Sequence, residues 1–317
     1  MFFSVFCKIN FGLRVLRRRP DGYHDLESIF LPVPFLHDDL ELTPLANPVD
    51  ETLLTLTGLP IDPQNNCQPA NISPDNGAQL SIQNNLCLRA YRLLKADFPD
   101  LPSVHIRLHK RIPTGAGLGG GSSDAAFTLK GLNTLFGLGL DEAAMERYAA
   151  RLGADCPFFI RCVPAFVEGI GDRLTPLDHN PIEGYRLLLA KPPEAVNTRE
   201  AYAGLDAKME VMENMEGMER IESITSIPSI NSISQSAWTP KSSARTPGND
   251  FEASVFPRHP AIAALKADFY ALGATYASMS GSGSVVYGLF EDAATLRTAA
   301  QRLRQGHPDY QLFFEEK

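Results

Sequence analysis

The stretch Pro113-Thr-Gly-Ala-Gly-Leu-Gly-Gly-Gly-Ser-Ser123 decides the fold of this chain, because it places five glycines and two serines in eleven residues. It follows an alternating apolar and polar run, 104–108, that predicts a half-buried strand. It leads into a run, 122–136, with serine N-cap candidates and then apolar residues at helical spacing. A strand, a glycine loop and a helix start direct backbone N–H groups and the helix dipole at an anion. The sequence therefore predicts a phosphate-binding loop.

Three kinds of glycine-rich loop compete for this pattern. A Walker loop needs a lysine after its last glycine, and here the glycines run into two serines instead. The dinucleotide-binding pattern is formally present at Gly115, Gly117 and Gly120, but it also needs an acidic residue about twenty positions on, at a strand end. Asp141 lies near that offset and looks like the cap of another helix. A glycine-rich turn that binds no ligand is the third alternative.

Length and composition set the broad class. A chain of 317 residues, 44% hydrophobic and 21% charged, is long enough for two globular domains. A net charge of −8 argues against a general nucleic-acid surface. Five cysteines without C-x-x-C spacing favour reduced thiols over a disulfide framework or a zinc site. Since the first apolar run is too short for a signal peptide and none is long enough for a membrane span, we expect a soluble cytoplasmic protein, monomer or homodimer.

The remaining patterns predict regular elements on both sides of the loop. We expect Asn84 and Asn85 to cap a helix, and Gly153 to end another. Helices are expected over 86–97, 141–152, 261–272 and 293–303, and a short one after 192. Strands are expected over 3–11, 39–43, 52–57, 185–191 and 310–314, with a hairpin over 165–174 and a loop over 60–74. The methionine- and serine-rich run 208–246, with Met209, Met212, Met215, Met218 and Trp238, predicts a mostly mobile surface insertion.

Polar residues in the first strand point to a cleft. Lys8 and Asn10 lie two apart on an otherwise apolar strand, and an unpaired buried charge is costly. They either line a cleft or, as the plainer alternative, face water on an edge strand. The turn signal Pro20-Asp-Gly22 follows, and Tyr23 and His24 come directly after it. A ring for stacking and an imidazole for hydrogen bonds suit a pyrimidine base.

Three segments together resemble the GHMP kinases, small-molecule kinases that hold ATP in a glycine loop. The loop 113–123 resembles the second motif of that family, and Met279-Ser-Gly-Ser-Gly-Ser284 resembles the third. The opening, Lys8-Ile-Asn-Phe11 followed by Pro-Asp-Gly-Tyr-His24, resembles members that act on a cytidylated methylerythritol. The resemblance implies an α+β fold of two domains, a ribosomal protein S5-like domain over 1–165 and a ferredoxin-like α/β-plait domain over 166–317.

The resemblance also implies an activity. It is the ATP-dependent phosphorylation, with Mg²⁺, of the 2-hydroxyl of 4-diphosphocytidyl-2-C-methyl-D-erythritol in non-mevalonate isoprenoid biosynthesis. Two alternatives stay open: another GHMP kinase of the homoserine or mevalonate type, and a regulator of the same fold that binds nucleotide without chemistry. Lys8 and Asp155 standing together weigh against the regulator.

The same resemblance assigns residues to roles. In Gly153-Ala-Asp-Cys-Pro-Phe-Phe159, Asp155 would be the catalytic base and Lys8 its catalytic partner, at a helix-to-strand junction. ATP would be bound by the loop: Pro113, Thr114, Gly115, Ala116, Gly117, Leu118, Gly119, Gly120, Gly121, Ser122 and Ser123. The cytidylated substrate would be bound by Asn10, Tyr23, His24, Thr198 and Tyr202. The third-motif loop would close over both through Ser280, Gly281, Ser282 and Gly283.

Each of these residues has a plainer structural interpretation. Asp155 would then cap a helix, Thr198 would be an N-cap, and Tyr202 would pack in a core. If Tyr202 binds substrate instead, it could sandwich the base against Tyr23. Asn84 and Asn85 are weak candidates for the nucleotide side. No pattern fixes the metal ligands, although Ser122, Ser123 and Asp124 lie suitably at the loop–helix junction.

Overall fold

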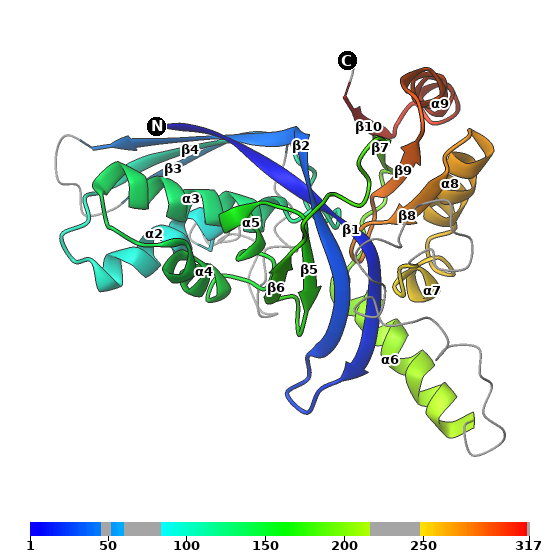
Figure 1. Ribbon diagram of the computed structural model, residues 1–317, viewed down its shortest axis with the longest axis horizontal. Helices are drawn as coiled ribbons and strands as arrows, with labels where there is room; N and C mark the ends of the chain where they lie inside the picture. The colour runs from blue at the N-terminus through cyan, green and yellow to red at the C-terminus, as the bar shows by residue number, and fades with distance from the viewer. Residues whose placement is uncertain (46–51, 60–83, 216–247, 316–317) are drawn as a thin grey trace, which may run out of the picture. The chain divides into compact units, whose positions relative to one another are not determined.

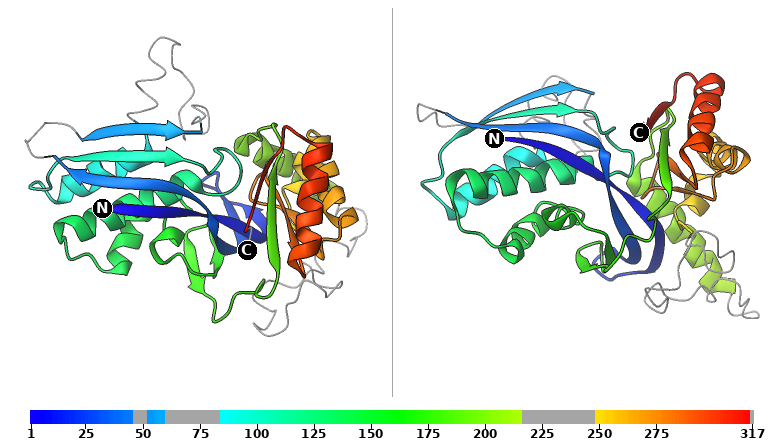
Figure 2. Two further views of the ribbon diagram at one scale, coloured as in Figure 1. Left: turned by 90° about the horizontal axis from the view of Figure 1, so that it is seen from above. Right: turned by 45° about the horizontal axis from the view of Figure 1, so that its top comes forward.

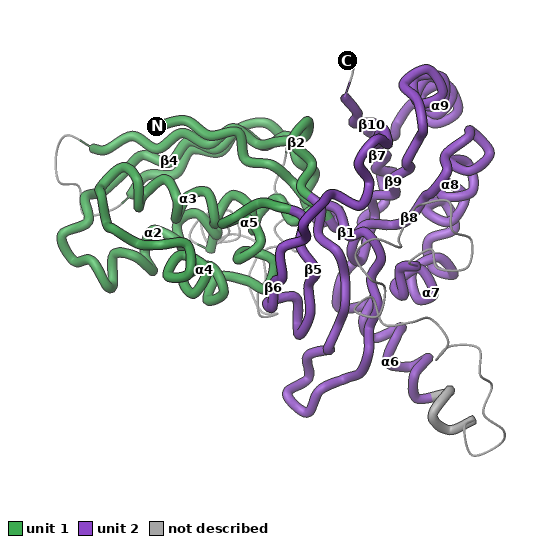
Figure 3. The backbone as a smooth tube through the Cα atoms, in the orientation of Figure 1, with its two compact units in different colours: residues 1–8, 32–114, 118–163 green, residues 9–31, 115–117, 164–317 purple. Residues whose placement is uncertain are grey.

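A computed structural model describes residues 1–45, 52–59, 84–215 and 248–315 of the chain (Figure 1), without the side chains of 211–215. These residues form two compact units, coloured separately in Figure 3. Unit 1 holds residues 1–8, 32–114 and 118–163, and unit 2 holds 9–31, 115–117 and 164–317. The boundary expected at residue 165 stays a prediction. Among the helices of the described ranges, none combines the length and apolarity needed to cross a membrane.

Unit 1 is a sheet covered by helices. Its strands come from β1 (Phe2–Arg18), β2 (His24–Pro44), β3 (Leu53–Gly58) and β4 (Val104–Lys110). β3 runs parallel to β4, and β4 runs antiparallel to the second half of β2, with Leu42 opposite Ile106. Its helices are α2 (Leu86–Asp97), α3 (Gly120–Phe136), α4 (Glu142–Ala150) and α5 (Phe158–Arg161). Figures 1 and 2 show these helices on one face of the strands.

Helix α3 is held tightly on that sheet because one of its residues has no side chain. A Cβ at Gly131 would lie 2.4 Å from Leu42 Cδ1 and 2.8 Å from Phe3 Cε2. Close packing of this kind leaves no room for a methyl group, so the helix axis is fixed relative to β1 and β2. The N-terminus of α3, where the glycine loop ends, is positioned by this contact.

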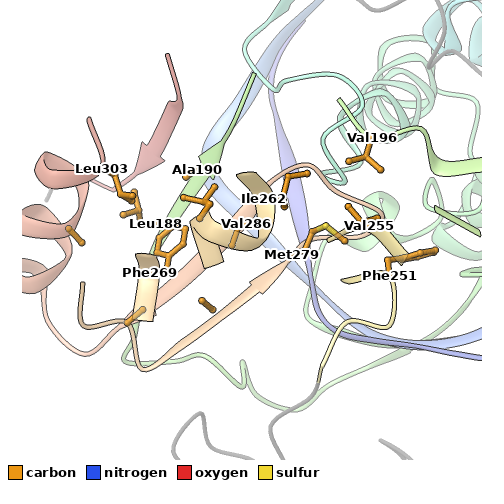
Figure 4. Packing of buried hydrophobic residues seen from close by; sticks show 14 of the residues in the cluster. Leu188, Ala190, Val196, Phe251, Val255, Ile262, Phe269, Met279, Val286 and Leu303 are labelled. Atoms are coloured by element: carbon orange, nitrogen blue, oxygen red, sulfur yellow. The ribbon is translucent and has the colours of Figure 1, made fainter. Parts of the chain in front are cut away.

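Unit 2 contains a hairpin and a second sheet. The hairpin is β5 (Ala165–Glu168) and β6 (Arg173–Pro176), and β5 also pairs with β2 around Ile29. The antiparallel sheet has the order β10 (Gln311–Phe314), β7 (Arg186–Lys191), β9 (Val286–Phe290), β8 (Tyr276–Met279). The helices are α6 (Thr198–Met215), α7 (Glu252–Val255), α8 (Pro260–Ala271) and α9 (Ala293–Gly306). Figure 4 shows apolar side chains of α7, α8 and α9 meeting those of β7, β8 and β9 in one core.

The expected elements appear, and several of their bounds differ. Helix α3 begins at Gly120 rather than at a serine cap, because Gly119 adopts the left-handed conformation (φ 70°, ψ 17°) that glycine reaches without strain. Helix α4 ends at the C-cap Arg151, two residues before Gly153. Helix α6 is longer than expected and includes Lys208–Met215. Residues 216–246 of the expected insertion, with Met218 and Trp238, lie outside the described residues, as does the loop 60–74.

Candidate active site

The pair of Lys8 and Asp155 forms within unit 1. Lys8 lies on β1 and is 3% exposed, and its Nζ is 3.5 Å from Asp155 Oδ2. Burial excludes the alternative of an edge lysine in water, and the carboxylate partner compensates the buried charge. Asp155 keeps 32% of its side chain exposed and lies in the turn between α4 and α5.

The surroundings of Asp155 differ from the expected helix-to-strand junction, and they exclude the capping alternative at α5. The turn leads into the short helix α5 rather than into a strand, because residues 158–161 form one helical turn. The N-cap of α5 is Pro157, and no side chain caps that helix, so Asp155 is not its capping carboxylate. The carboxylate therefore has no capping task at α5, and the residue it meets is a buried ammonium.

The ammonium of Lys8 lies beside the end of the glycine loop. The backbone N–H of Lys8 donates to Leu118 O at 3.0 Å. A Cβ at Gly119 would lie 3.3 Å from Lys8 Cε and 3.0 Å from Phe159 Cζ, so glycine is required for the strand and the loop to approach. Because Gly119 is the N-cap of α3, the lysine side chain runs past the positive end of that helix.

The first turn of α3 offers backbone donors to an anion. Gly119 has no side chain, so no side-chain hydrogen bond caps this end of the helix. The first i→i−4 bond within the turn is from Ser123 N to Gly119 O, 2.9 Å. The N–H groups before it have no carbonyl within the helix to donate to. Uncapped donors beside a lysine suit a phosphate group, which fits the expected binding of ATP.

Within unit 2, the first half of the glycine loop meets the third-motif loop. Ser280 Oγ donates to Gly117 O at 2.9 Å, and the backbone N–H of Asn10 donates to that Oγ at 3.2 Å. Val285 N donates to Ala116 O at 3.3 Å. A Cβ at Gly117 would lie 1.9 Å from Ser280 O, so the two backbones are in direct contact. The two motifs, 163 residues apart, therefore form one continuous structure.

Unit 2 also brings together most of the expected substrate residues. The rings of His24 and Tyr202 stack with centroids 4.6 Å apart and an interplanar angle of 21°. Asp206, which the sequence did not suggest, has its Oδ1 2.6 Å from His24 Nε2. Thr198 Oγ1 is 2.8 Å from Ser282 Oγ in the third-motif loop. The imidazole thus has both a stacking partner and a fixed hydrogen-bond partner.

Other expected substrate residues have different surroundings. Asn10 is buried and its Nδ2 donates to Ser28 Oγ at 3.1 Å, so the amide is oriented by β2. Tyr23 is 60% exposed. The Tyr202 ring stacks on His24 and contacts Phe251 at 4.7 Å, so it also packs against the core. A sandwich of a base between Tyr23 and Tyr202 stays a prediction. Asn85 is the N-cap of α2 and accepts from Cys87 N at 2.9 Å, whereas Asn84 is exposed.

Metal binding by protein side chains alone has little support here. Within the described ranges, no group of three or more His, Cys, Asp or Glu residues could hold a metal ion. Ser123 Oγ donates to Phe6 O at 2.6 Å, and Asp124 Oδ2 accepts from Lys110 Nζ at 2.6 Å. Ser122 is half-buried in the first turn of α3. A Mg²⁺ that arrives with a nucleotide needs only one or two protein ligands, so the hydroxyl of Ser122 would suffice.

Comparison with known proteins places the chain in a family. Residues 85–162 match the GHMP kinases N terminal domain, and residues 238–309 match the GHMP kinases C terminal domain. The 4-diphosphocytidyl-2-C-methyl-D-erythritol kinases of Bacteroides fragilis and Bacteroides thetaiotaomicron are 42% and 43% identical, over 90% and 92% of both chains. The chain belongs to the 4-diphosphocytidyl-2-C-methyl-D-erythritol kinase family.

Solved structures agree with this membership of the kinase family. A crystal structure of a 4-(cytidine 5'-diphospho)-2C-methyl-D-erythritol kinase matches 99% of this chain and 98% of its own, with a TM-score of 0.69 and 29% identity. The mevalonate kinase of Methanococcus jannaschii matches with a TM-score of 0.61 at 13% identity, which shows the fold alone. The α+β GHMP kinase fold expected from the sequence is confirmed. The chain is an ATP-dependent small-molecule kinase.

Two residues of this kinase that sequence reasoning missed hold parts of the site in place. Asn249 is buried, and its Nδ2 donates to Met279 O at 2.7 Å and to Gly281 O at 2.8 Å, which fixes the third-motif loop. The string Asn249-Asp-Phe-Glu252 contains no local pattern that indicates this contact. Asp206 follows Thr198 and Tyr202 at four-residue spacing, which places all three on one helix face. The helix expected after residue 192 was short, so the prediction did not include Asp206.

Proposed function

We propose that this chain transfers the γ-phosphoryl group of ATP to the 2-hydroxyl of 4-diphosphocytidyl-2-C-methyl-D-erythritol. The observation that carries the proposal is the pair of Lys8 Nζ and Asp155 Oδ2, 3.5 Å apart, beside the uncapped N-terminus of α3. A carboxylate for a proton and an ammonium next to a phosphate-binding loop are what phosphoryl transfer to an alcohol requires.

In this proposal Asp155 accepts the proton of the attacking hydroxyl. Lys8, whose Nζ lies 3.5 Å from that carboxylate, stabilises the negative charge that develops on the transferred group. The backbone N–H groups at the start of α3 bind phosphate oxygens. A Mg²⁺ bound with ATP would neutralise phosphate charge. At the loop–helix junction, Ser123 is hydrogen-bonded to Phe6 and Asp124 is paired with Lys110, so the hydroxyl of Ser122 is the group that would hold the ion.

The cytidine end of the acceptor is assigned to unit 2. His24 and Tyr202 form a stacked pair, and Asp206 accepts a hydrogen bond at His24 Nε2. A carboxylate there favours the tautomer with the proton on Nε2, which leaves Nδ1 as an acceptor in the neutral ring. An acceptor nitrogen matches the exocyclic amino group of cytosine. We place the reaction in the cytoplasm, carried out by a monomer or homodimer on small molecules alone.

The test of this proposal is ADP release by the purified protein with three alcohols under the same conditions. Turnover with the cytidylated methylerythritol, and little with mevalonate or homoserine, is the expected result. Turnover with either other alcohol alone would keep the kinase chemistry and overturn the acceptor. ATP binding without turnover on any of the three would favour a regulator of the same fold.

Asp206 should control acceptor affinity through His24. In Asp206→Ala, the imidazole loses its charged hydrogen-bond partner at 2.6 Å, and we expect the acceptor KM to rise about tenfold. The KM for ATP should stay within twofold, because no nucleotide contact is assigned to this residue. Steady-state kinetics with each substrate varied in turn measure both constants.

A matched control for this variant lies one turn further along α6. Glu210→Ala removes an exposed carboxylate from the same helix and should leave both KM values unchanged. If Asp206→Ala left the acceptor KM at the wild-type value, the positioning role would be wrong. A rise of equal size in both KM values would point instead to a general loss of structure.

A further inference from the structure

Three buried charged side chains of unit 1 lie outside the site described above. Lys110 is the last residue of β4, Asp38 lies on β2, and Asp124 lies in α3. Lys110 Nζ donates to Asp38 Oδ2 and, at 2.6 Å, to Asp124 Oδ2. The three side chains are 3%, 0% and 5% exposed. Burying such a group of charges costs free energy, so its presence in the fold requires an explanation.

The group holds the glycine loop at both of its ends. Lys110 stands three residues before the loop and Asp124 immediately after it, so their ion pair joins the segments that flank the loop. The second oxygen of Asp38 accepts the backbone N–H groups of Arg111, at 2.5 Å, and Ile112, at 2.8 Å. The conformation of the two residues that lead into the loop is therefore fixed by β2, a strand to which they do not belong.

The fit at the start of α3 is equally close. A Cβ at Gly120 would lie 2.8 Å from Ile112 Cγ2 and 3.5 Å from Lys110 Nζ. Gly120 is the first residue of α3, so the helix turn that offers its N–H groups to an anion packs directly on the held segment. A shift of Lys110 or Ile112 would be transmitted to that turn, since closely packed groups move together.

We propose that Lys110, Asp38 and Asp124 form a loop clamp that sets the conformation of the nucleotide loop and thereby the affinity for ATP. The clamp acts through backbone position and touches no reacting atom, so its members are positioning residues. This inference rests on the proposed function only in taking the loop 113–123 as the ATP site.

The charges of the loop clamp are not balanced, and this decides which variant tests it. Burial alone would lower the pKa of Lys110, but Asp124 and Asp38 raise it, so the ammonium is retained. Burial raises the pKa of Asp124 to about 7, against the opposing effect of Lys110. Asp124 Oδ1 has no hydrogen-bond partner among the described residues. Removing Lys110 would leave two facing carboxylates, whereas removing Asp124 leaves the Lys110–Asp38 pair compensated.

Asp124→Ala is therefore the variant to make. We expect the Kd for a non-hydrolysable ATP analogue, measured by calorimetry, to rise about tenfold, because one end of the loop is released. Hydrogen exchange of a peptide spanning 113–123 should speed up, with α9 unchanged. Asp124→Asn keeps an oxygen that accepts from Lys110, so it should restore both readouts to near the wild-type values.

A matched control separates the loop from overall stability. Asp141→Ala removes the carboxylate that accepts from Ala144 N at 2.7 Å and caps α4, without touching either end of the loop. It should lower the melting temperature and leave the Kd unchanged. Should Asp124→Ala fail to fold, Asp124→Val fills the same volume without a polar group and serves in its place.

The outcomes are distinct. An unchanged Kd in folded Asp124→Ala or Asp124→Val would overturn the loop clamp, and so would a Kd in Asp124→Asn as weak as in the alanine variant. Either result would leave the proposed function standing, because the analogue reports on the nucleotide site without any acceptor. If the wild-type protein showed no turnover on the cytidylated alcohol while the Kd values followed the expected pattern, the assignment of the acceptor would be wrong and the loop clamp would stand.

Discussion

Asp155→Asn should lower kcat for phosphoryl transfer by about 10²- to 10⁴-fold, the usual contribution of a general base. The amide has nearly the shape of the carboxylate but cannot take the proton of the attacking hydroxyl. Lys8 also loses the carboxylate that lies 3.5 Å from its Nζ. Since Asp155 keeps 32% of its side chain exposed, the substitution should cost little stability.

Affinity for the nucleotide separates this effect from a general defect. The Kd for a non-hydrolysable ATP analogue should stay within about threefold of wild type, because no ATP contact is assigned to Asp155. Asp97→Asn is the matched control, an exposed aspartate of the same unit whose Oδ2 accepts from Tyr148 Oη. Residual turnover within tenfold of wild type would mean that Asp155 is not the base, and Lys8 would then have to be tested alone.

Local patterns in the sequence predicted most of the elements, since each depends on neighbours along the chain. The helix expected over 86–97 appears as α2, with Asn85 as its cap. The hairpin expected over 165–174 appears as β5 and β6. The start of α3 was misplaced because serine is a common N-cap, whereas here Gly119 takes that position and Ser123 donates to Phe6 O.

Contacts between residues that are distant in the sequence could not be predicted, because no local pattern encodes them. Asp206 lies 182 residues from His24, and Asp38 lies 72 residues from Lys110. Each of these acids reads as an ordinary polar residue on its own element. The roles assigned to Lys8 and Asp155 came from a resemblance between motifs, and the 3.5 Å distance between them is the new physical support. Those roles stay predictions until the variants are measured.

Gly117→Ala should destabilise the protein more than substitution of any exposed glycine of similar conformation. Gly117 has φ 75°, where an L-residue costs about 1–2 kcal/mol. The added Cβ would also lie 1.9 Å from Ser280 O, a backbone atom that cannot rotate away. One loop must therefore move, and overpacking of this kind adds about 1–3 kcal/mol. We expect a loss of about 2–5 kcal/mol in the free energy of unfolding, measured by urea denaturation.

Gly139→Ala isolates the backbone part of that cost. Gly139 has φ 71°, and nothing lies within 4 Å of an added Cβ. The variant should therefore lose only about 1–2 kcal/mol and keep the affinity for an ATP analogue. Gly117→Ala should also weaken that affinity, because displacing the third-motif loop disturbs the segment that begins the nucleotide loop. Equal losses in the two variants would mean that Gly117 and Ser280 do not touch, and the joining of the second and third motifs would be wrong.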